Sequence, residues 1–421
     1  MLRYDRKCTG RGPLSRPPLS PFAFGPQMRR LLSLGITSIA AVLISVADGR
    51  SATIFSGIGL GDEESVPDGR ASGMGGAGIA LLDGENFVRL NPAVLASFRR
   101  PAVSALFRAE QRRVKDRLGQ NDLANGDMGY VRVVLANPKG IALRLALESV
   151  TGASFSFAQP EAGSVEPDTL KLEIEGGLQA VSFGIGLRLM ENHLYLGADL
   201  EAILMGTIKE TWTRTFVDAS LFPSQDQISR KHRGYRWTGG LAYKLDNGVS
   251  LGAFITPRTG LSGTRFHETI FGGTGESRLK ANLPTSFGWG LAYQDASKKW
   301  VAAADLRFSL WGKVDAARYR NARGLGLGIG YVTGSDDRLN ASLRIPLRAG
   351  FSRRVLQYNG LPGGNRAVTE TSAGFGVGVP FKDNWGRFEV SFEAGKRGNV
   401  QENGARELFF KQTFSIVGWA R

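Results

Sequence analysis

The chain has 421 residues, 53 of them basic and 38 acidic, and a formal net charge of +15. Its 56 glycines are nearly twice the usual share of about 7 per cent, but they follow no G-X-Y period, which excludes a collagen-like chain. Aromatic side chains and interspersed charges argue against intrinsic disorder. The length alone allows either several soluble domains or one large barrel.

The N-terminal region predicts a targeting segment. Residues 28–47, MRRLLSLGITSIAAVLISVA, begin with a basic pair, continue as an apolar run and end in a small-residue cleavage site, which is the pattern of a secretory signal peptide. A membrane anchor is the alternative, but a spanning helix needs about 20 apolar residues. The proline-rich residues 1–27 are expected to be a non-native or disordered extension from a misplaced start codon.

Removal of residues 1–47 changes the charge and the cysteine content. Seven basic residues and Asp5 leave with this segment, so the net charge falls from +15 to +9. The weaker basicity argues against a nucleic-acid partner. The only cysteine, Cys8, is also removed, which suits an oxidising compartment in which no disulfide is needed.

Short segments with alternating apolar and polar residues follow the signal peptide. In VAAADLRFSLW, residues 301–311, Leu306 and Phe308 face one way and Asp305 and Arg307 the other, which is typical of strands with one apolar face. We predict fourteen strands near residues 101–112, 127–136, 140–150, 178–189, 193–209, 234–245, 248–258, 284–294, 299–311, 322–333, 338–351, 368–379, 387–397 and 406–417.

Loop lengths favour a transmembrane barrel over a soluble sandwich. Connections after the even strands are short, for example NPKG, MENH and LDNG, whereas wider gaps fall at residues 151–177, 210–233 and 259–283. Outer-membrane barrels alternate short periplasmic turns with longer outer loops in this way. We therefore expect an all-β fold: a transmembrane antiparallel barrel of about 14 strands over residues 101–421, in the bacterial outer membrane, with residues 48–100 as a periplasmic segment and plug.

A barrel fold predicts which side chains face the lipid and which face the lumen. Aromatic residues near strand ends, such as Tyr130, Tyr195, Trp289 and Trp311, would form interfacial girdles. Arginine facing lipid near the midplane would cost about 2–4 kcal/mol, so the polar faces should line the lumen. The residues expected there are Arg144, Glu148, Arg188, Asp199, Glu201, Asp305, Arg307, Glu389 and Glu393.

RASGMGGAGIALLDGENFVRLNPA, residues 70–93, contains a G-x-G-x-x-G spacing. A dinucleotide site would need a strand before it and a helix after it, but an acidic, turn-like stretch precedes it. The motif instead resembles the N-terminal hatch of the FadL/TodX family of outer-membrane transport proteins and its PorV-like relatives. Residues 235–259 and 283–315 resemble hairpins of the same family.

The resemblance implies a fourteen-stranded barrel plugged by an N-terminal hatch, through which hydrophobic molecules such as long-chain fatty acids or aromatic hydrocarbons diffuse passively. The alternative, implied by the PorV-like relatives, is a structural or protein-secretion-associated barrel. The hatch or gate residues carried over are Gly73, Met74, Gly75, Gly76, Ala77, Gly78, Asn91, Pro92 and Ala93.

Further partners follow from the same placement. Outer-membrane lipids and lipopolysaccharide would surround the barrel, and the barrel-assembly machinery would insert it, although the chain ends in Trp419, Ala420 and Arg421 rather than in an aromatic residue. Arg230, Lys231 and Arg233 in a predicted outer loop would attract an anionic group, unless that loop is simply solvated.

Enzymatic signals are weak. Ser250 lies in GVSLG, but the nucleophile elbow needs a helix after the serine, and a strand is predicted there. The three histidines show no metal-ligand spacing. We expect no enzyme activity, no cofactor and no metal site; an outer-membrane lipase stays an alternative, because a catalytic triad assembles in space.

Overall fold

The structure is a computed structural model that describes residues 52–57, 59–63, 68–117, 119–160, 168–218, 220–269, 272–334, 344–361, 366–381 and 385–420. The expected extension and signal peptide, and part of the strand predicted at 338–351, lie outside these ranges. None of the helices in the described residues is long and apolar enough to cross a membrane.

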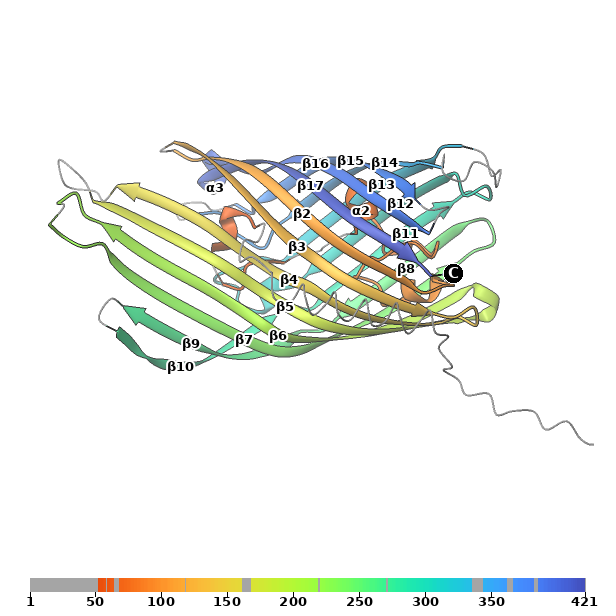
Figure 1. Ribbon diagram of the computed structural model, residues 1–421, viewed down its shortest axis with the longest axis horizontal. Coiled ribbons are helices and arrows are strands. Elements are labelled where there is room, and N and C mark those ends of the chain that lie inside the picture. The colour runs from red at the N-terminus through yellow and green to blue at the C-terminus, as the bar shows by residue number, and fades with distance from the viewer. Residues whose placement is uncertain are drawn as a thin grey trace, which may run out of the picture. The chain divides into compact units, whose positions relative to one another are not determined.

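The described strands form a closed antiparallel barrel (Figure 1). Each strand pairs with the next along the chain, except where a proline divides one strand into two, and β17 pairs back with β2. The strands are β2 (Ala102–Lys115), β3 (Gln120–Ala136), β4 (Ile141–Pro160), β5 (Thr169–Leu189), β6 (Leu194–Thr215), β7 (Ser224–Lys244), β8 (Val249–Thr256), β9 (Thr259–Thr269), β10 (Gly272–Leu283), β11 (Ser286–Gln294), β12 (Trp300–Ser309), β13 (Ala322–Val332), β14 (Pro346–Val355), β15 (Thr369–Phe381), β16 (Gly386–Asn399) and β17 (Ala405–Trp419).

Two prolines divide two of the barrel strands. β8 and β9 both pair with β7 and are separated by Pro257, while β10 and β11 pair with β9 and β8 and are separated by Pro284. Proline has no N–H for the ladder, so it interrupts a strand. Counting each interrupted pair as one strand gives fourteen barrel strands, which confirms the predicted number.

The loop prediction is partly wrong. The turns at 137–140, 190–193 and 245–248 are short, as predicted. The wider gaps at 151–177, 210–233 and 259–283 are instead largely strand, because β4 to β7, β9 and β10 continue well past the apolar segments. Antiparallel pairs whose two faces are polar hold together through ladder hydrogen bonds, and sequence alternation reports only the stretches with an apolar face.

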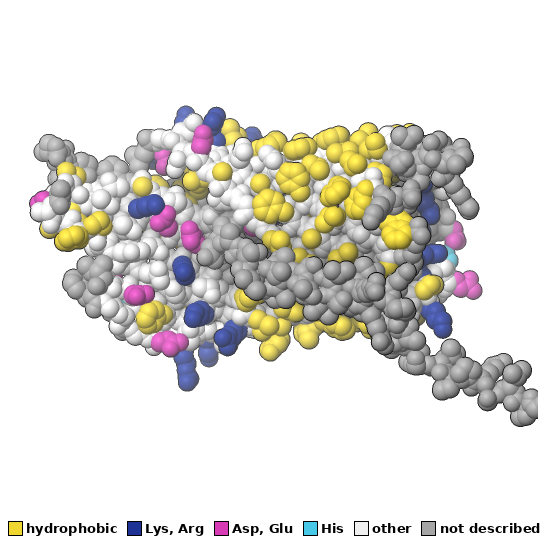
Figure 2. All heavy atoms as spheres, in the orientation of Figure 1, with side chains coloured by type: hydrophobic (Ala, Val, Ile, Leu, Met, Phe, Trp, Pro, Cys, Tyr) yellow, Lys and Arg dark blue, Asp and Glu magenta, His cyan; other side chains and the backbone are white. Residues whose placement is uncertain are grey.

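The outer wall carries an apolar belt. Figure 2 shows hydrophobic side chains in a band, with charged side chains gathered toward both ends of the same face. Phe183 and Trp289 are each 52% exposed, whereas Arg144 and Asp305 are each 1% exposed in the lumen. The wall thus alternates apolar outward and polar inward, as a barrel in lipid requires. Tyr130, Tyr195 and Trp311 are buried, so their assignment to the girdles is wrong.

One seam interrupts the ladder. β3 and β4 pair only between residues 130–136 and 142–148, and Figure 1 shows them diverging beyond that stretch. The neighbouring ladders skip Gly129 in β3 and Val150 in β4 where this pairing stops, and such bulges bend a strand. β1 (Asp62–Glu63) pairs with β4 at Thr151 and Gly152. We call this break the β3–β4 seam.

Candidate functional site: the plugged lumen

Residues 68–98 lie inside the barrel, and we call this segment the plug. It contains α2 (Gly69–Gly73) and the 3-10 helix η2 (Pro92–Ser97). α2 contacts β14 to β17, and η2 contacts β4 to β7 on the other side of the lumen. In Figure 1 the orange segment with α2 lies behind strands of the near wall. The plug therefore spans the lumen from one wall to the other.

Two buried side chains hold the plug in its own shape. The Asp68 carboxylate caps α2 by accepting from Ala71 N at 2.6 Å, and it also accepts from Phe87 N at 2.7 Å. Burial raises the pKa of Asp68, and these backbone donors oppose the rise. Asn86 Nδ2 donates to Gly78 O at 2.7 Å. These bonds tie α2 and the following loop into one unit.

Asn91 connects the second half of the plug to the wall. Its Oδ1 caps η2 by accepting from Ala93 N at 3.1 Å. Its Nδ2 donates to Ile79 O at 2.8 Å within the plug and to Leu241 O of β7 at 3.1 Å. Pro92 occupies the first turn of η2, where no N–H is needed. The N-P-A part of the motif is therefore a helix start that is fixed to the barrel.

Two strand residues hold the middle of the plug. Asp305 of β12 accepts from Gly78 N at 2.7 Å and from Ile79 N at 3.0 Å. Ser250 of β8 donates to Ala80 O at 2.7 Å. The serine of the GVSLG stretch is thus a plug contact on a strand. Asp305 was predicted to face the lumen, and the structure adds its plug partners.

Glycines on both sides allow the plug backbone to touch the wall. Gly75 has a φ of +65°, and a Cβ there would lie 2.3 Å from Phe351 O. A Cβ at Gly350 of β14 would lie 2.1 Å from Gly75 N, and one at Gly328 of β13 would lie 2.6 Å from Met74 O. No side chain fits at such separations, so this part of the interface is backbone against backbone.

The structure brings the nine predicted hatch residues together in the plug. Met74, Ala77, Asn91 and Ala93 are fully buried. Gly73, Gly75 and Gly76 lie against the wall, whereas Gly78 lies against Val88 and Asn86 within the plug. A gating role for them stays a prediction. The wall glycines were missed, although GLGLGIG at 324–330 places a glycine at every second position, which is the inward face of a strand.

We expect Asp305→Ala to loosen the plug. The change leaves the N–H groups of Gly78 and Ile79 buried without an acceptor, at a cost of about 1–3 kcal/mol for each group. Hydrogen exchange on the full chain in detergent should become faster at these two amides. Asp122→Ala, which removes an exposed ion pair with Arg113, is the control and should leave them unchanged. Unaltered exchange in Asp305→Ala would contradict this role.

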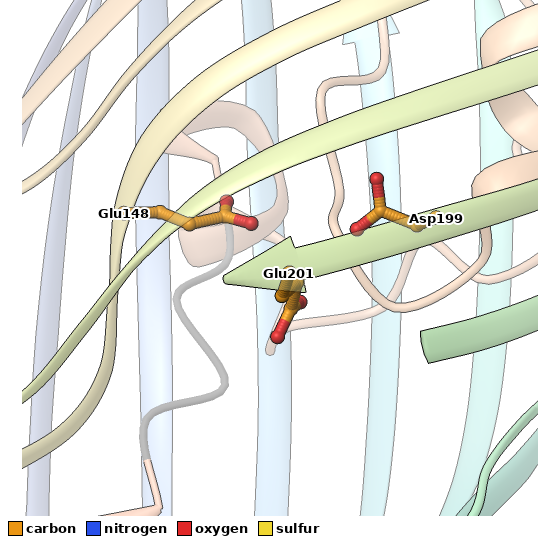
Figure 3. A group of neighbouring side chains, drawn as sticks. All are labelled: Glu148, Asp199 and Glu201. Atoms are coloured by element: carbon orange, nitrogen blue, oxygen red, sulfur yellow. The ribbon is translucent and has the colours of Figure 1, made fainter. Parts of the chain in front are cut away.

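Ion pairs fill the lumen beside the plug. Three buried carboxylates project from β4 and β6 (Figure 3). The pairs are Arg132–Glu148 at 2.7 Å, Arg144–Asp199 at 2.7 Å, Arg236–Glu201 at 2.6 Å and Arg89–Glu201 at 3.8 Å. The carboxylates lie close enough to share a metal ion, but four guanidinium groups already outweigh their three charges. This group therefore favours ion pairing over cation binding.

Arg397 is the centre of a second network. Its guanidinium contacts Glu110 of β2 at 2.8 Å, Glu407 of β17 at 3.1 Å, and Glu370 of β15. Glu407 in turn accepts from Ile54 N at 2.7 Å. Since Arg397 lies on β16, the network joins four strands of the wall, β2, β15, β16 and β17, to the segment that precedes the plug.

Further ion pairs link the plug to the wall near the short turns. Arg387 of β16 contacts Glu85 of the plug at 2.9 Å, and Arg70 pairs with Asp83 within the plug. Arg348 of β14 pairs with Glu389 beside them. The plug is thus held by charge as well as by backbone contacts.

Two lumen cavities between the described residues measure about 70 and about 100 Å³. The smaller is lined mainly by charged side chains such as Arg307, Glu370 and Arg397. The larger adds Phe254 and Phe308. Ligand sites usually measure about 300–1,000 Å³, so neither cavity has the size of an acyl-chain site in this state.

The predicted anion-attracting residues are not in a loop. Arg230, Lys231 and Arg233 belong to β7, where they pair with β9. Arg230 forms an ion pair with Glu210 of β6. The loop assignment is wrong because β7 begins earlier, at Ser224, and its polar stretch carries no apolar alternation.

The comparisons agree with this architecture. The sequence matches the family described as BamG over residues 28–417. No curated protein matches it. It is similar in fold to the Pseudomonas putida toluene transporter TodX (16% identity, 86% of this chain and 99% of that chain, TM-score 0.55), the Ralstonia pickettii toluene transporter TbuX (15%, 84% and 98%, 0.53) and a Pseudomonas aeruginosa FadL homologue (12%, 85% and 98%, 0.56).

The expected resemblance to FadL/TodX barrels is confirmed at the level of the fold, which this chain shares with outer-membrane channels for hydrophobic molecules. At such identities the likeness concerns the fold and not the cargo. The family match extends over nearly the whole sequence. This outer-membrane β-barrel, with its lumen occupied by a plug, belongs to the BamG family.

Proposed function

We propose that the protein is a closed structural barrel that works through its surfaces, as a partner of the machinery that assembles outer-membrane proteins. The observation that carries the proposal is the plug, which is fixed to the wall by backbone contacts, by Asp305 and by ion pairs. The BamG family description supports an association with barrel assembly.

The energy needed to open the lumen supports a structural role. Plug movement would leave the N–H groups of Gly78 and Ile79 without the Asp305 carboxylate, and each unsatisfied buried group costs about 1–3 kcal/mol. It would also separate the Arg387–Glu85 pair, in which Glu85 is half-exposed. A plug that opened at each passage of a solute would need compensation for these losses, and the described lumen offers none.

Depletion of the protein in its own cells tests this function. The expected result is a fall in the amounts of several unrelated outer-membrane barrels, with unchanged uptake of labelled toluene and oleate. Restoring the wild-type chain should restore those barrels. Normal barrel amounts together with reduced uptake would overturn the proposal and favour a channel.

A second candidate is passive uptake of hydrophobic small molecules, and the β3–β4 seam favours it. The seam breaks the wall beside β1, and Phe254 and Phe308 give one lumen cavity an apolar part. A buried methylene gains about 0.8 kcal/mol, so an enlarged cavity could capture an apolar solute without chemistry. TodX and TbuX, which are similar in fold, are toluene transporters.

A disulfide across the seam tests this second candidate. Asn125 Nδ2 lies 2.5 Å from Ser154 Oγ across the seam, so Asn125→Cys with Ser154→Cys should join β3 to β4. If hydrophobic solutes cross there, oxidation should abolish uptake and reduction should restore it. The control is Ser352→Cys with Ser372→Cys, which joins two fully paired strands and should have no effect. Equal uptake in both redox states of the seam variant would exclude this route.

A further inference from the structure

A basic basin occupies the short-turn mouth of the barrel, between the plug and the rim. Its cavity measures about 640 Å³, far more than either lumen cavity. The connection between the plug and β2 contributes Arg99 and Arg100, which are exposed. The rim contributes basic residues from β5, β7 and the turn between β11 and β12: Arg188, Lys244, Lys298 and Lys299.

The charge of the basin is not balanced by its own acids. Asp83 and Glu85 are the carboxylates among its described lining residues, and they pair with Arg70 and Arg387. In the part of the chain that the structure describes, the six basic residues named above form no ion pair with a carboxylate. Like charges around one low-dielectric mouth focus a positive potential and attract anions.

The contrast with the lumen marks the basin as a distinct surface. Deeper in the barrel, Arg132 pairs with Glu148, and Arg397 contacts three glutamates. Among the described residues, the six cations at the mouth have no such carboxylate partner. The unpaired charge therefore gathers on one concave surface that faces the aqueous side of the short turns.

We propose that this basin binds an acidic segment of a periplasmic polypeptide. A polypeptide reaches the basin from the aqueous side, whereas the headgroups of anionic lipids surround the outside of the barrel. The basin lies inside the rim, where Trp419 stacks with Arg100 at 5.1 Å. The inference rests on the proposed function for the presence of a protein partner, and on the basin alone for the chemistry of that partner.

Binding of a fluorescent hexaglutamate peptide to the purified full chain in detergent tests the site. The wild-type chain should bind it more tightly than the matched hexaglutamine peptide, and added salt should weaken the binding because the attraction is between exposed charges. Replacing Arg99, Arg100, Lys298 and Lys299 with glutamine should weaken binding at least about tenfold, as the loss of electrostatic complementarity predicts.

The matched control neutralises four exposed cations at the opposite end: Arg233, Arg265, Arg278 and Lys280. It should bind hexaglutamate like the wild type. Equal weakening in both variants, or equal binding of hexaglutamine, would overturn the site. Binding of phosphatidylglycerol vesicles or inorganic phosphate in place of hexaglutamate would also overturn it, in favour of a lipid or phosphate ligand. The assay needs no assembly phenotype, so its failure is distinct from failure of the proposed function.

Discussion

Gly350→Val should displace the plug from a barrel that still forms. The Gly350 Cα faces the plug so closely that a Cβ would lie 2.1 Å from Gly75 N and 2.2 Å from Met74 C. Overpacking a well-packed core costs about 1–3 kcal/mol and sometimes more, and here both partners are backbone, which cannot change rotamer. The strain can be relieved only if the plug moves away from β14.

Trypsin provides the measurement. Arg70 and Arg89 of the plug are each 7% exposed, so the folded wild-type chain should resist cleavage at both. Gly350→Val should be cut at one or both, while the barrel keeps its heat-dependent shift in gel mobility. Gly119→Val is the control, because a Cβ at Gly119 meets nothing within 4 Å. Equal protection of the two variants would show that the wall glycine does not seat the plug.

Arg397→Met should be among the most destabilising single changes in the chain. It removes the cation that contacts Glu110, Glu370 and Glu407 and leaves three buried carboxylates with less compensation. Breaking a buried pair in this way costs about 3–5 kcal/mol. The expected result is a lower midpoint of urea unfolding for the chain reconstituted in lipid vesicles.

Arg113→Met is the matched control for this change. Arg113 pairs with Asp122 at 2.9 Å, but the two side chains are 56% and 62% exposed, and exposed pairs contribute only about 0–1 kcal/mol. The midpoint of urea unfolding of Arg113→Met should therefore stay close to that of the wild type. Similar midpoints for the two variants would mean that the Arg397 network adds nothing to stability.

The sequence predicts the barrel well because a strand in lipid must alternate. Segments such as VAAADLRFSLW show an apolar outward face and a polar inward face, and the fourteen strands follow from them. The outer ends of β4 to β7 escaped prediction because both of their faces meet water there. Their strand structure depends on ladder pairing, which leaves no apolar period in the sequence.

The plug also shows which contacts the sequence alone does not predict. Its motif is visible in the sequence, but its partners are not. Gly78 and Asp305 are 227 residues apart, and Arg397 and Glu110 are 287 apart. Which cation meets which carboxylate is set by barrel closure, and no local pattern encodes it. The alternating glycines at 324–330 are one partner signal in the sequence, since inward glycines leave room for another backbone.

The most direct measurement of a closed lumen is flux through purified, full-length protein in liposomes. Wild-type proteoliposomes should admit labelled toluene no faster than protein-free liposomes and should show no steady ion conductance. Gly350→Val, with its plug displaced, should then conduct ions. Rapid, saturable entry of toluene through the wild-type chain would contradict a closed lumen and establish the protein as a channel.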